Sequence, residues 1–436
     1  MKTRDDAGAW VDEEFETLDL GDPRRDRRAK ELVKRFASRP TASIPGACEG
    51  WAETMAAYRF LGNERIDWRD MMQPHWDRTT TRMGQLPVVL CIADTTELNF
   101  NGQDIEGAGP LSYEAQVGMY LHATYAVTPD REPLGVMNAW MWAREPRDAN
   151  GRRGGVRESV RWVESYEIVA EQARALPDTR LVYVADREGD IAALMQRAQE
   201  LGEPADWLMR SQHNRALKGE ASLWETVHAS EVVGHISFVL PGRSGQKARE
   251  VRQELRSQRI TLPGRAGVTL TCIEAYEVDA PAGVKPVIWR LVTNREAGDA
   301  HALIELVDWY RARWEIEMFF KRLKHRLNLE HVSGLSQRAV AQDLAARVLC
   351  DNLQALTTLT AHTCHELPTD RRINRAYVHS VLKPLLPSLL LGIAAATSLA
   401  DALALIARHT FRHRPGISKQ RKPRSKPHKS MTQKPC

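Results

Sequence analysis

Two aspartates follow apolar runs that are typical of buried strands. Asp94 comes directly after ValValLeuCysIleAla (88–93), and Asp186 comes directly after LeuValTyrValAla (181–185). A helix predicted between the runs makes the two strands parallel, so their ends place the two carboxylates side by side. Because such carboxylates repel each other, a divalent metal held by oxygen ligands is a common stabilising partner. Taken singly, an acid at a strand end is most often a turn residue or a helix cap, so the pair alone does not decide the chemistry.

A polar stripe lies on a helix predicted over 303–329. Tyr310, Arg313, Glu317 and Lys324 are spaced i, i+3, i+7 and i+14, which at ~100° per residue places them within about 60° of one another. The neighbouring face is apolar and is formed by Ile316, Phe319, Phe320, Leu323 and Leu327. The alternative is a solvated face on which Arg313 and Glu317 form an ion pair, and spacing alone favours this alternative.

Strands form the middle of the chain. They are predicted at 88–93, 120–127, 134–142, 181–185 and 207–210. The first three form a meander, because a ThrProAspArgGluPro turn joins the second to the third, and a helix at 158–173 leads to the fourth. Residues 212–292 then alternate in strand fashion with turn residues between the runs, which indicates a β-rich insertion.

Helices flank this middle part. Residues 10 to about 75 are predicted to be helical, with Asp22 as an N-cap, Pro23 at the first helical position and a linker at 79–87. From Ala302 to about residue 411 the chain is again predicted to be helical. Breaks are expected at three places, near Gly334, near Pro368 and at Pro384–Pro387.

Composition excludes several classes of protein. The 436 residues are 43% apolar, which is enough to bury a large core in two to four domains. The apolar stretch at 384–407 is interrupted by Pro387, Gly392 and Asp401, so no membrane role follows. The N-terminus lacks the apolar segment of a secretory signal, and the six cysteines are scattered without a CxxC pair. We therefore expect a cytosolic protein with reduced thiols and no zinc site.

The basic residues are concentrated in the C-terminal tail. Residues 408–436 contain ten Lys or Arg and no acid, which leaves 51 basic against 56 acidic residues in the rest of the chain. Residues 412–429 are also rich in Pro and Ser, so the tail is predicted to be disordered and to seek phosphate. A solubilising tail explains the same composition equally well.

The polar stripe is part of a longer match to a known family. Its pattern Tyr-(2)-Arg-(3)-Glu-(6)-Lys resembles the signature of the insertion-sequence-4 family of bacterial DDE transposases. IleAlaAspThrThrGluLeuAsnPhe (92–100) and ValAlaAspArgGluGlyAspIle (184–191) resemble that family's first and second Asp blocks. LeuGlyAspProArgArg (20–25) and AlaAlaTyrArgPheLeu (56–61) resemble its N-terminal transposon-end-binding domain, so the resemblance covers roughly residues 10–395. LeuLeuProSerLeuLeuLeuGly (385–392) is similar to a C-terminal block of part of the family.

The resemblance implies an α/β fold with a ribonuclease-H-like catalytic core and a β-rich insertion, flanked by helical N-terminal and C-terminal regions. The implied parts are a helical DNA-binding domain for transposon ends (1–78), the catalytic domain (79–335, with the insertion at 212–292), a helical region suited to dimerisation (336–411) and the basic disordered tail (412–436). The strand order deduced from the residues agrees with this fold.

The resemblance also implies a cut-and-paste transposase with an Asp-Asp-Glu site. Asp94 would bridge two Mg²⁺ ions, with Mn²⁺ as a substitute, while Asp186 and Glu317 would each hold one ion. Water would nick the strand, excision would proceed through a hairpin, and the freed 3′-OH would join target DNA. The implied partners are double-stranded DNA, as terminal inverted repeats and as target, and a second copy of the chain in the synaptic complex. The implied location is the bacterial cytoplasm, at the nucleoid when DNA is bound.

Several residues acquire DNA-binding roles through the resemblance. Tyr310, Arg313 and Lys324 would donate to phosphate oxygens beside the scissile bond. Trp289 occupies the place of an aromatic that could stack on a base displaced during hairpin formation, whereas a half-buried strand tryptophan explains it equally well. Further phosphate contacts are expected from Arg210, His213 and Arg215 after the fifth strand, and from Arg24, Arg25, Arg28 and Arg59, for which solvated helix charges are the alternative.

Three other polar residues are left out of the site, and two other functions stay open. Glu188 and Asp190 fit the first turn of a short helix after Asp186, and His122 fits a strand core. A DNA-binding regulator of the same ancestry would bind transposon ends without cutting them. A structure-specific nuclease on the same fold would need neither the stripe nor the N-terminal block. The intact Asp94, Asp186 and Glu317 favour the transposase.

Overall fold

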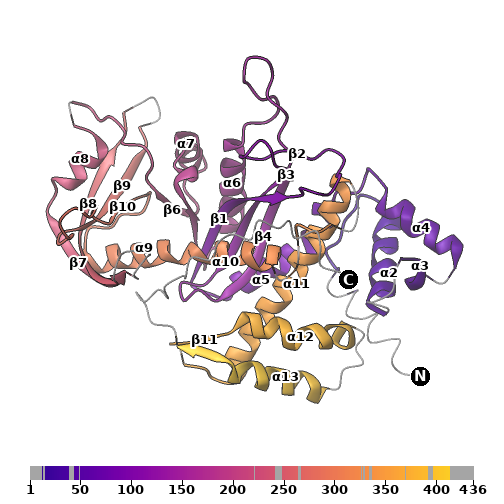
Figure 1. The fold of residues 1–436 in the computed structure, drawn as a ribbon. Coiled ribbons are helices and arrows are strands. Elements are labelled where there is room, and N and C mark those ends of the chain that lie inside the picture. The colour runs from indigo at the N-terminus through magenta and orange to yellow at the C-terminus, as the bar shows by residue number, and fades with distance from the viewer. Residues whose placement is uncertain are drawn as a thin grey trace.

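The structure is a computed structural model that describes residues 12, 15–38, 44–48, 50–219, 221–240, 248–263, 267–325, 327, 329–332, 336–368, 370–390 and 396–412. The basic tail predicted at 412–436 lies outside these residues apart from Arg412. Within the described part the fold is α/β, with a large mixed sheet at its centre and helical regions at both ends of the chain (Figure 1).

The predicted strands assemble into one mixed sheet. β1 (Val88–Asn99), β3 (Val117–Val127) and β4 (Pro133–Trp142) form the antiparallel meander, and β5 (Arg180–Ala185) is parallel to β1, as predicted. β6 (Asp206–Arg210) is parallel to β5, and the short β2 (Gly109–Pro110) pairs with the start of β3. The resulting order β4-β3-β1-β5-β6 is that of a ribonuclease-H-like core. The fold class implied by the sequence is therefore confirmed.

The β-rich insertion is present and continues the same sheet. Its elements are α8 (Leu223–His228), β7 (Val232–Leu240), β8 (Arg249–Thr261), β9 (Thr269–Glu277) and β10 (Ile288–Thr293). β10 pairs antiparallel with β6, and the sheet then runs β10-β9-β8-β7. The insertion is consequently tied to the ribonuclease-H-like core by backbone hydrogen bonds as well as by the chain.

Helices cover both faces of the sheet. One face packs against α6 (Ser159–Ala175) and α7 (Ala192–Glu200) through a core that includes Trp162, Tyr166 and Leu194. The other face packs against α9 (Ala300–Ala312), α10 (Trp314–His325) and α11 (Gln337–Cys364) through a second core that includes Leu306 and Phe319. α9 and α10 follow one another across the sheet (Figure 1).

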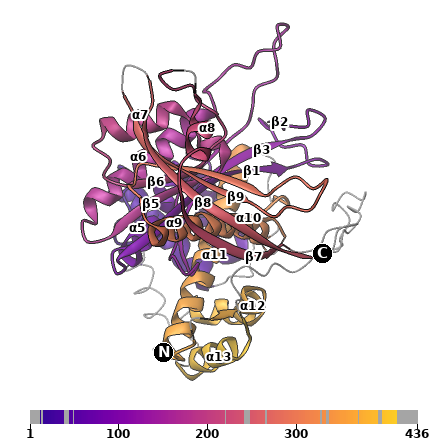
Figure 2. The ribbon, with the colours of Figure 1, turned by 90° about the vertical axis from the view of Figure 1, so that its left-hand side faces the viewer.

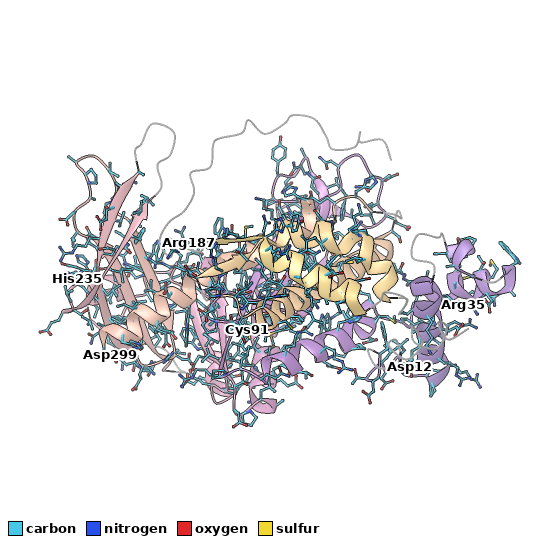
Figure 3. The ribbon with its side chains drawn as sticks, turned by 90° about the horizontal axis from the view of Figure 1, so that it is seen from below. Asp12, Arg35, Cys91, Arg187, His235 and Asp299 are labelled. Carbon is cyan, nitrogen blue, oxygen red and sulfur yellow. The ribbon has the colours of Figure 1, made fainter. Side chains whose placement is uncertain are left out.

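The N-terminal region consists of α2 (Pro23–Ser38), α3 (Ile44–Ala47), α4 (Trp51–Leu61) and α5 (Trp68–Met83). Asp22 caps α2 as predicted, because its Oδ1 accepts the N–H of Arg24 at 2.8 Å. These helices and the insertion lie at opposite ends of the molecule, as the labels Arg35 and His235 show, with Arg187 between them (Figure 3).

The linker predicted at 79–87 is wrong over residues 79–83, which continue α5. Thr79 and Met83 are fully buried, and Arg82 Nε donates to the carbonyl of Leu134 on β4 at 2.8 Å. Packing against the sheet therefore outweighs the weak helix propensity of the threonine run. The domain boundary proposed after residue 78 falls inside this helix.

The C-terminal region contains α12 (Arg375–Leu390) and α13 (Ala396–Arg408), which pack against α11 below the sheet (Figure 2). The break predicted at Pro384–Pro387 is wrong, since α12 continues through both prolines. Packing of Val378 and Leu382 against Ile406 holds the helix in place. The two-stranded sheet of β11 (Arg371–Ile373) and β12 (Thr410–Arg412) was not predicted. No helix in the described ranges is long and apolar enough to cross a bilayer.

Candidate active site

The two strand-end aspartates lie next to each other, although Asp94 is not at the end of its strand. β1 pairs with β5 only as far as Ile92 and Val184, and Asp94 and Asp186 each lie two residues farther on. The prediction that β1 ends before Asp94 is wrong, because pairing with β3 carries it on to Asn99. The carboxylates therefore flank the point at which the parallel pairing stops.

Each of the two aspartates accepts a hydrogen bond from a backbone N–H group. Asp94 Oδ1 accepts the N–H of Thr95 at 2.8 Å, and Asp186 Oδ1 accepts the N–H of Glu188 at 2.8 Å. Asp186 is the N-cap of η1 (Arg187–Gly189), so the cap interpretation is correct for this residue. One oxygen of each carboxylate is engaged in this way.

Arg313 joins Asp94 to Glu317. The single helix predicted over 303–329 is divided at this residue, which is the C-cap of α9, but the helical register continues into α10. Arg313 Nη1 donates to Asp94 Oδ2 at 3.0 Å, and Nη2 donates to Glu317 Oε1 at 2.7 Å. The i, i+4 ion pair between Arg313 and Glu317, which the solvated-face alternative predicts, is therefore present. The same guanidinium also links α10 to Asp94 on β1.

Negative charge dominates this centre. Burial and the neighbouring Asp186 raise the pKa of Asp94 to about 7, although Arg313 and the Thr95 N–H oppose this. Burial and Asp186 also raise the pKa of Glu188. Arg313 contacts only two of these carboxylates, Asp94 and Glu317, while Asp186 and Glu188 add negative charge next to Asp94, so further positive charge would be stabilised here.

The donor set fits a hard divalent cation, because Asp94, Asp186 and Glu317 offer only carboxylate oxygens. No group of three or more His, Cys, Asp or Glu in the described ranges is already spaced as a metal site. Arg313 separates Asp94 from Glu317, so its guanidinium must turn away before both can share an ion.

Tyr310 and Arg210 border the carboxylates. Tyr310 is only 8% exposed, and burial raises its pKa against the opposing positive charges of Arg313 and Arg210. Burial also lowers the pKa of Arg210. Lys324 is directed elsewhere, since its Nζ donates to the carbonyl of Glu97 and lies 3.6 Å from Glu330. It ties α10 to β1, and its role in DNA binding stays a prediction.

A small cavity beside Asp186 contains residues that the sequence did not single out. It measures about 240 Å³ and is lined by Arg187, Arg210, Trp224 and Arg290, among others. The guanidinium of Arg290 lies 4.7 Å from the Trp224 ring centroid. Arg187 could have been identified from the sequence, because it directly follows Asp186. Trp224 and Arg290 are distant from Asp186 in the chain, so the sequence gives no indication that they lie near it.

Arg215 forms a buried ion pair instead of facing solvent. Its Nη2 lies 2.6 Å from Oδ1 of the fully buried Asp190. Asp190 Oδ2 also accepts the N–H groups of Gln212 and His213 at 2.7 and 2.9 Å. Asp190 thus anchors this loop, and it is the C-cap of η1 and not a residue of a first helical turn as predicted. His122 is a buried strand residue as predicted, with Nδ1 2.9 Å from Thr95 Oγ1.

Trp289 is half-buried in β10 and belongs to an aromatic cluster. It stacks on Phe238 with ring centroids 6.0 Å apart, and the Arg311 guanidinium lies 5.2 and 5.3 Å from the Phe238 and Trp289 ring centroids. This arrangement matches the half-buried strand interpretation. A base-stacking role stays a prediction.

The predicted basic residues of the N-terminal region lie on α2 and α4. Arg24 and Arg59 are exposed, Arg28 is half-buried, and Arg25 Nη1 donates to the carbonyl of Leu20 at 3.0 Å. Two aromatic residues of α4, which the sequence reasoning missed, are exposed on the helix that carries Arg59, with values of 75% for Trp51 and 45% for Tyr58. Exposed cations beside exposed aromatic rings form a surface suited to a polyanion.

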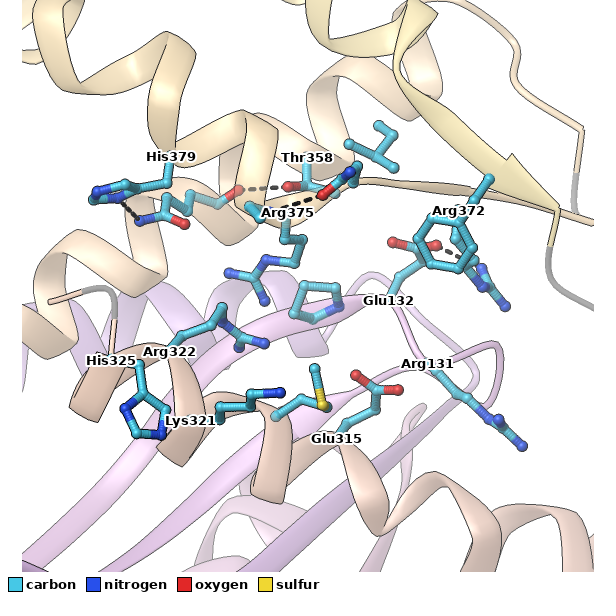
Figure 4. Close-up of a pocket in the computed structure, with 17 residues that line it drawn as sticks. Arg131, Glu132, Glu315, Lys321, Arg322, His325, Thr358, Arg372, Arg375 and His379 are labelled. Carbon is cyan, nitrogen blue, oxygen red and sulfur yellow. Dashed lines mark hydrogen bonds and ion pairs between the residues drawn. The ribbon is translucent and has the colours of Figure 1, made fainter. Parts of the chain in front are cut away.

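A separate polar cavity of about 580 Å³ lies between α10 and the C-terminal helices (Figure 4). Glu315, Arg322 and His325 contribute to it from a side of α10 different from that of Glu317. Figure 4 shows Arg375 of α12 above this opening. The cavity is therefore distinct from the carboxylate centre.

Two family models match the chain. The model described as Transposase DNA-binding matches residues 7–66, and the model described as Transposase DDE domain matches residues 163–353. The second match includes Asp186 and Glu317, whereas Asp94 precedes it. Among solved structures, the chain is similar to a piggyBac transposase synaptic complex with hairpin DNA, with 10% identity, a TM-score of 0.39 and coverage of 96% of this chain and 84% of that chain. The two matched domains show that the chain belongs to the DDE transposases, which bind, cleave and join DNA.

Proposed function

We propose that the chain is a cut-and-paste transposase of the insertion-sequence-4 family, which excises its element and inserts it into target DNA. The observation that supports this most strongly is the meeting of Asp94, Asp186 and Glu317, which come from two neighbouring strands and a helix far along the chain. The Tyr310-Arg313-Glu317-Lys324 pattern lies on the helices that complete this meeting.

The carboxylates and their neighbours divide the work of phosphoryl transfer. Asp94, Asp186 and Glu317 would hold two Mg²⁺ ions, or Mn²⁺ in their place, which supply Lewis-acid activation of water for nicking and of the 3′-OH for hairpin formation and strand transfer. Arg313 and Arg210 donate to non-bridging phosphate oxygens, and the hydroxyl of Tyr310 orients both guanidinium groups. Lys324 holds α10 against β1 by donating to the Glu97 carbonyl, which fixes the position of Glu317 relative to Asp94.

The N-terminal helices bind the terminal inverted repeats. Arg24 and Arg59 supply exposed positive charge for phosphate, and Trp51 and Tyr58 supply exposed aromatic surface beside it. Two copies of the chain pair two ends in a synaptic complex, so that each end is cut by an assembled dimer.

The test is metal-dependent cleavage of a DNA fragment that spans the gene and its flanks. We expect the wild-type chain to make discrete cuts at an inverted repeat with Mg²⁺ or Mn²⁺ and none with EDTA. Glu317→Gln should reduce cleavage more than about 100-fold, since even outer partners of a metal ligand are worth about 10–100-fold. Glu315→Gln is the matched control, because Glu315 lies on the same helix and lines the separate cavity.

The same experiment distinguishes the alternatives. Binding to the repeats without any cut contradicts the transposase and identifies a regulator of transposition. Cuts at junctions or flaps without preference for a repeat contradict it in favour of a structure-specific nuclease. Cleavage by Glu317→Gln at the wild-type rate contradicts the assignment of the third carboxylate.

A further inference from the structure

An arginine-rich loop leaves the sheet beside the carboxylates. It comprises residues 143–158, between the end of β4 and the start of α6, and is called the arginine loop below. It contains five arginines and three acids. Figures 1 and 2 show it projecting beyond the end of the sheet, well clear of the helices that cover the two faces.

The arginine loop has a defined internal structure. Asp148 Oδ1 accepts the N–H groups of Asn150 and Arg152 at 2.9 and 2.7 Å, and Gly151 takes a φ of +75° at the tip. Arg147 and Arg153 face each other across the two arms, and both donate to Glu114 Oε1, at 2.8 and 2.6 Å. The loop is therefore held in one shape by its own sequence and by one neighbouring acid.

The base of the arginine loop lies at the catalytic carboxylates. Arg144 and Glu158 form an ion pair there, and Arg144 donates to the Tyr120 hydroxyl, which in turn donates to Glu97 on β1, three residues after Asp94. Glu158 is the N-cap of α6, which packs against η1, the turn that follows Asp186. A cavity of about 680 Å³ opens at this base, with walls that include Arg144, Arg157, Arg161 and Trp142. Trp142 stacks on Tyr120 with ring centroids 5.6 Å apart, and the Arg144 guanidinium lies 4.0 Å from the Tyr120 centroid. Guanidinium groups beside aromatic faces are surroundings that nucleic acids favour.

Only some of the arginines in the arginine loop form ion pairs with acids. Arg144 is neutralised by Glu158, and Arg147 and Arg153 share Glu114. Arg152 and Arg157 are exposed, and neither side chain has an acidic partner within the described ranges of the chain. Their guanidinium groups are available to a ligand that carries several negative charges, such as the phosphates of a nucleic acid backbone.

We propose that the arginine loop grips the phosphate backbone of duplex DNA that runs past the catalytic carboxylates, with Arg152 and Arg157 as its phosphate contacts. The proposal rests on the proposed function, because it requires a scissile phosphate at Asp94 and Asp186. DNA is favoured over an acidic protein because any duplex that presents such a phosphate must extend beyond the site, and the loop projects from the same end of the sheet. The backbone belongs either to the DNA that flanks the element or to target DNA, and both offer the same phosphate chemistry.

The test compares salt-dependent DNA binding by the full chain and by Arg152→Ala/Arg157→Ala. Removing two phosphate contacts should reduce the slope of log affinity against log salt concentration by about 1.8, at about 0.9 per contact on duplex DNA. Arg152→Lys/Arg157→Lys retains the charges and should retain the slope. The matched control is Arg180→Ala/Arg197→Ala, which removes two partly exposed arginines remote from the arginine loop, at the start of β5 and the end of α7, and should leave the slope unchanged.

Two DNA probes separate the two sources of the backbone. A reduced slope on a repeat that carries its flank, but not on the repeat alone, assigns the loop to flanking DNA. A reduced slope on a duplex of unrelated sequence, offered to the chain already bound to repeats, assigns it to target DNA. An unchanged slope with every probe overturns the proposal, and so does a changed oligomeric state with unchanged DNA binding.

Failure of this proposal can be distinguished from failure of the proposed function. If the wild-type chain cuts at the repeats and the variant keeps the wild-type slope, the arginine loop proposal is wrong and the transposase stands. If the wild-type chain neither binds nor cuts the repeats, both are wrong. Thermal unfolding of the variant at the wild-type temperature excludes a loss of fold as the cause of weaker binding.

Discussion

A buried cluster of charges joins α10 to the C-terminal region. Asp351 of α11 is fully buried, and Arg322 of α10 donates to it twice, at 2.6 and 3.1 Å. Arg375 of α12 donates to the same carboxylate at 3.3 Å, and both arginines donate to the Tyr125 hydroxyl at 2.9 Å. Burial alone would raise the pKa of Asp351, but Arg322 and Arg375 hold it below its ordinary value. Asp351 is therefore charged and shared by three elements.

Asp351→Asn keeps the shape of this side chain and removes its charge. Two guanidinium groups that are only 12% and 15% exposed then lose the carboxylate to which they donate. Breaking one side of a buried pair costs about 3–5 kcal/mol. We expect about 3 kcal/mol here, because both arginines retain some contact with water and the Tyr125 hydroxyl. The measurement is urea unfolding, followed by circular dichroism and by tryptophan fluorescence, with the change in free energy taken from the midpoint and slope.

The control is an ion pair of similar composition at the surface. Arg412→Ala breaks its pair with Asp370, whose two side chains are 62% and 44% exposed, and should cost less than about 1 kcal/mol. The argument is refuted if Asp351→Asn costs no more than Arg412→Ala. The cluster would then be poorly paired in solution, and α10 would not depend on the C-terminal helices for its position.

Two further predictions concern the core sheet. Burial lowers the pKa of His122 from 6.5 to about 3, so the folded chain keeps this imidazole neutral while the unfolded chain protonates it below pH 6.5. The stability of the wild-type fold is therefore lost as pH falls from 6.5 towards 3. The melting temperature of His122→Gln should decline less than that of the wild type over this range, and equal declines would contradict a neutral His122. A Cβ at Gly118 would overlap the carbonyl oxygen of Leu98, so Gly118→Ala should cost at least about 2 kcal/mol in urea unfolding. Gly298→Ala, which meets no atom within 4 Å, should stay within about 0.5 kcal/mol, and a similar loss at both glycines would refute the overlap.

The carboxylate site could be predicted in part because its signals are local. A continuous apolar run before Asp94 and another before Asp186 identify strands buried on both faces, and an intervening helix makes them parallel. The helical spacing of Arg313 and Glu317 places both on one stripe. That Arg313 reaches Asp94, 219 positions earlier in the chain, has no local signal.

The errors share one physical cause. Threonines at 79–81 and prolines at 384 and 387 disfavour helix locally, yet α5 and α12 continue through them because their apolar faces are packed against β4 and against α11 and α13. β1 extends beyond Asp94 because β3 lies beside it, which residues 94–99 alone do not indicate. Threonine disfavours a helix by only tenths of a kcal/mol, but proline in a helix interior costs about 3 kcal/mol. Burial of one large apolar side chain is worth about 1.5–3 kcal/mol, so packing of several such side chains outweighs both costs.

The sequence by itself determined most strands and helices of the central sheet and its cover, and which residue types the site contains, because apolar periodicity, caps and turn residues act between near neighbours in the chain. Only the tertiary structure decided what these elements meet. It placed Arg313 between Asp94 and Glu317, paired Arg215 with the buried Asp190, and joined the base of the arginine loop to β1 through Tyr120 and Glu97. Such contacts join residues that are far apart in the chain, and a charged side chain has the same local pattern whether it is solvated or buried against a partner.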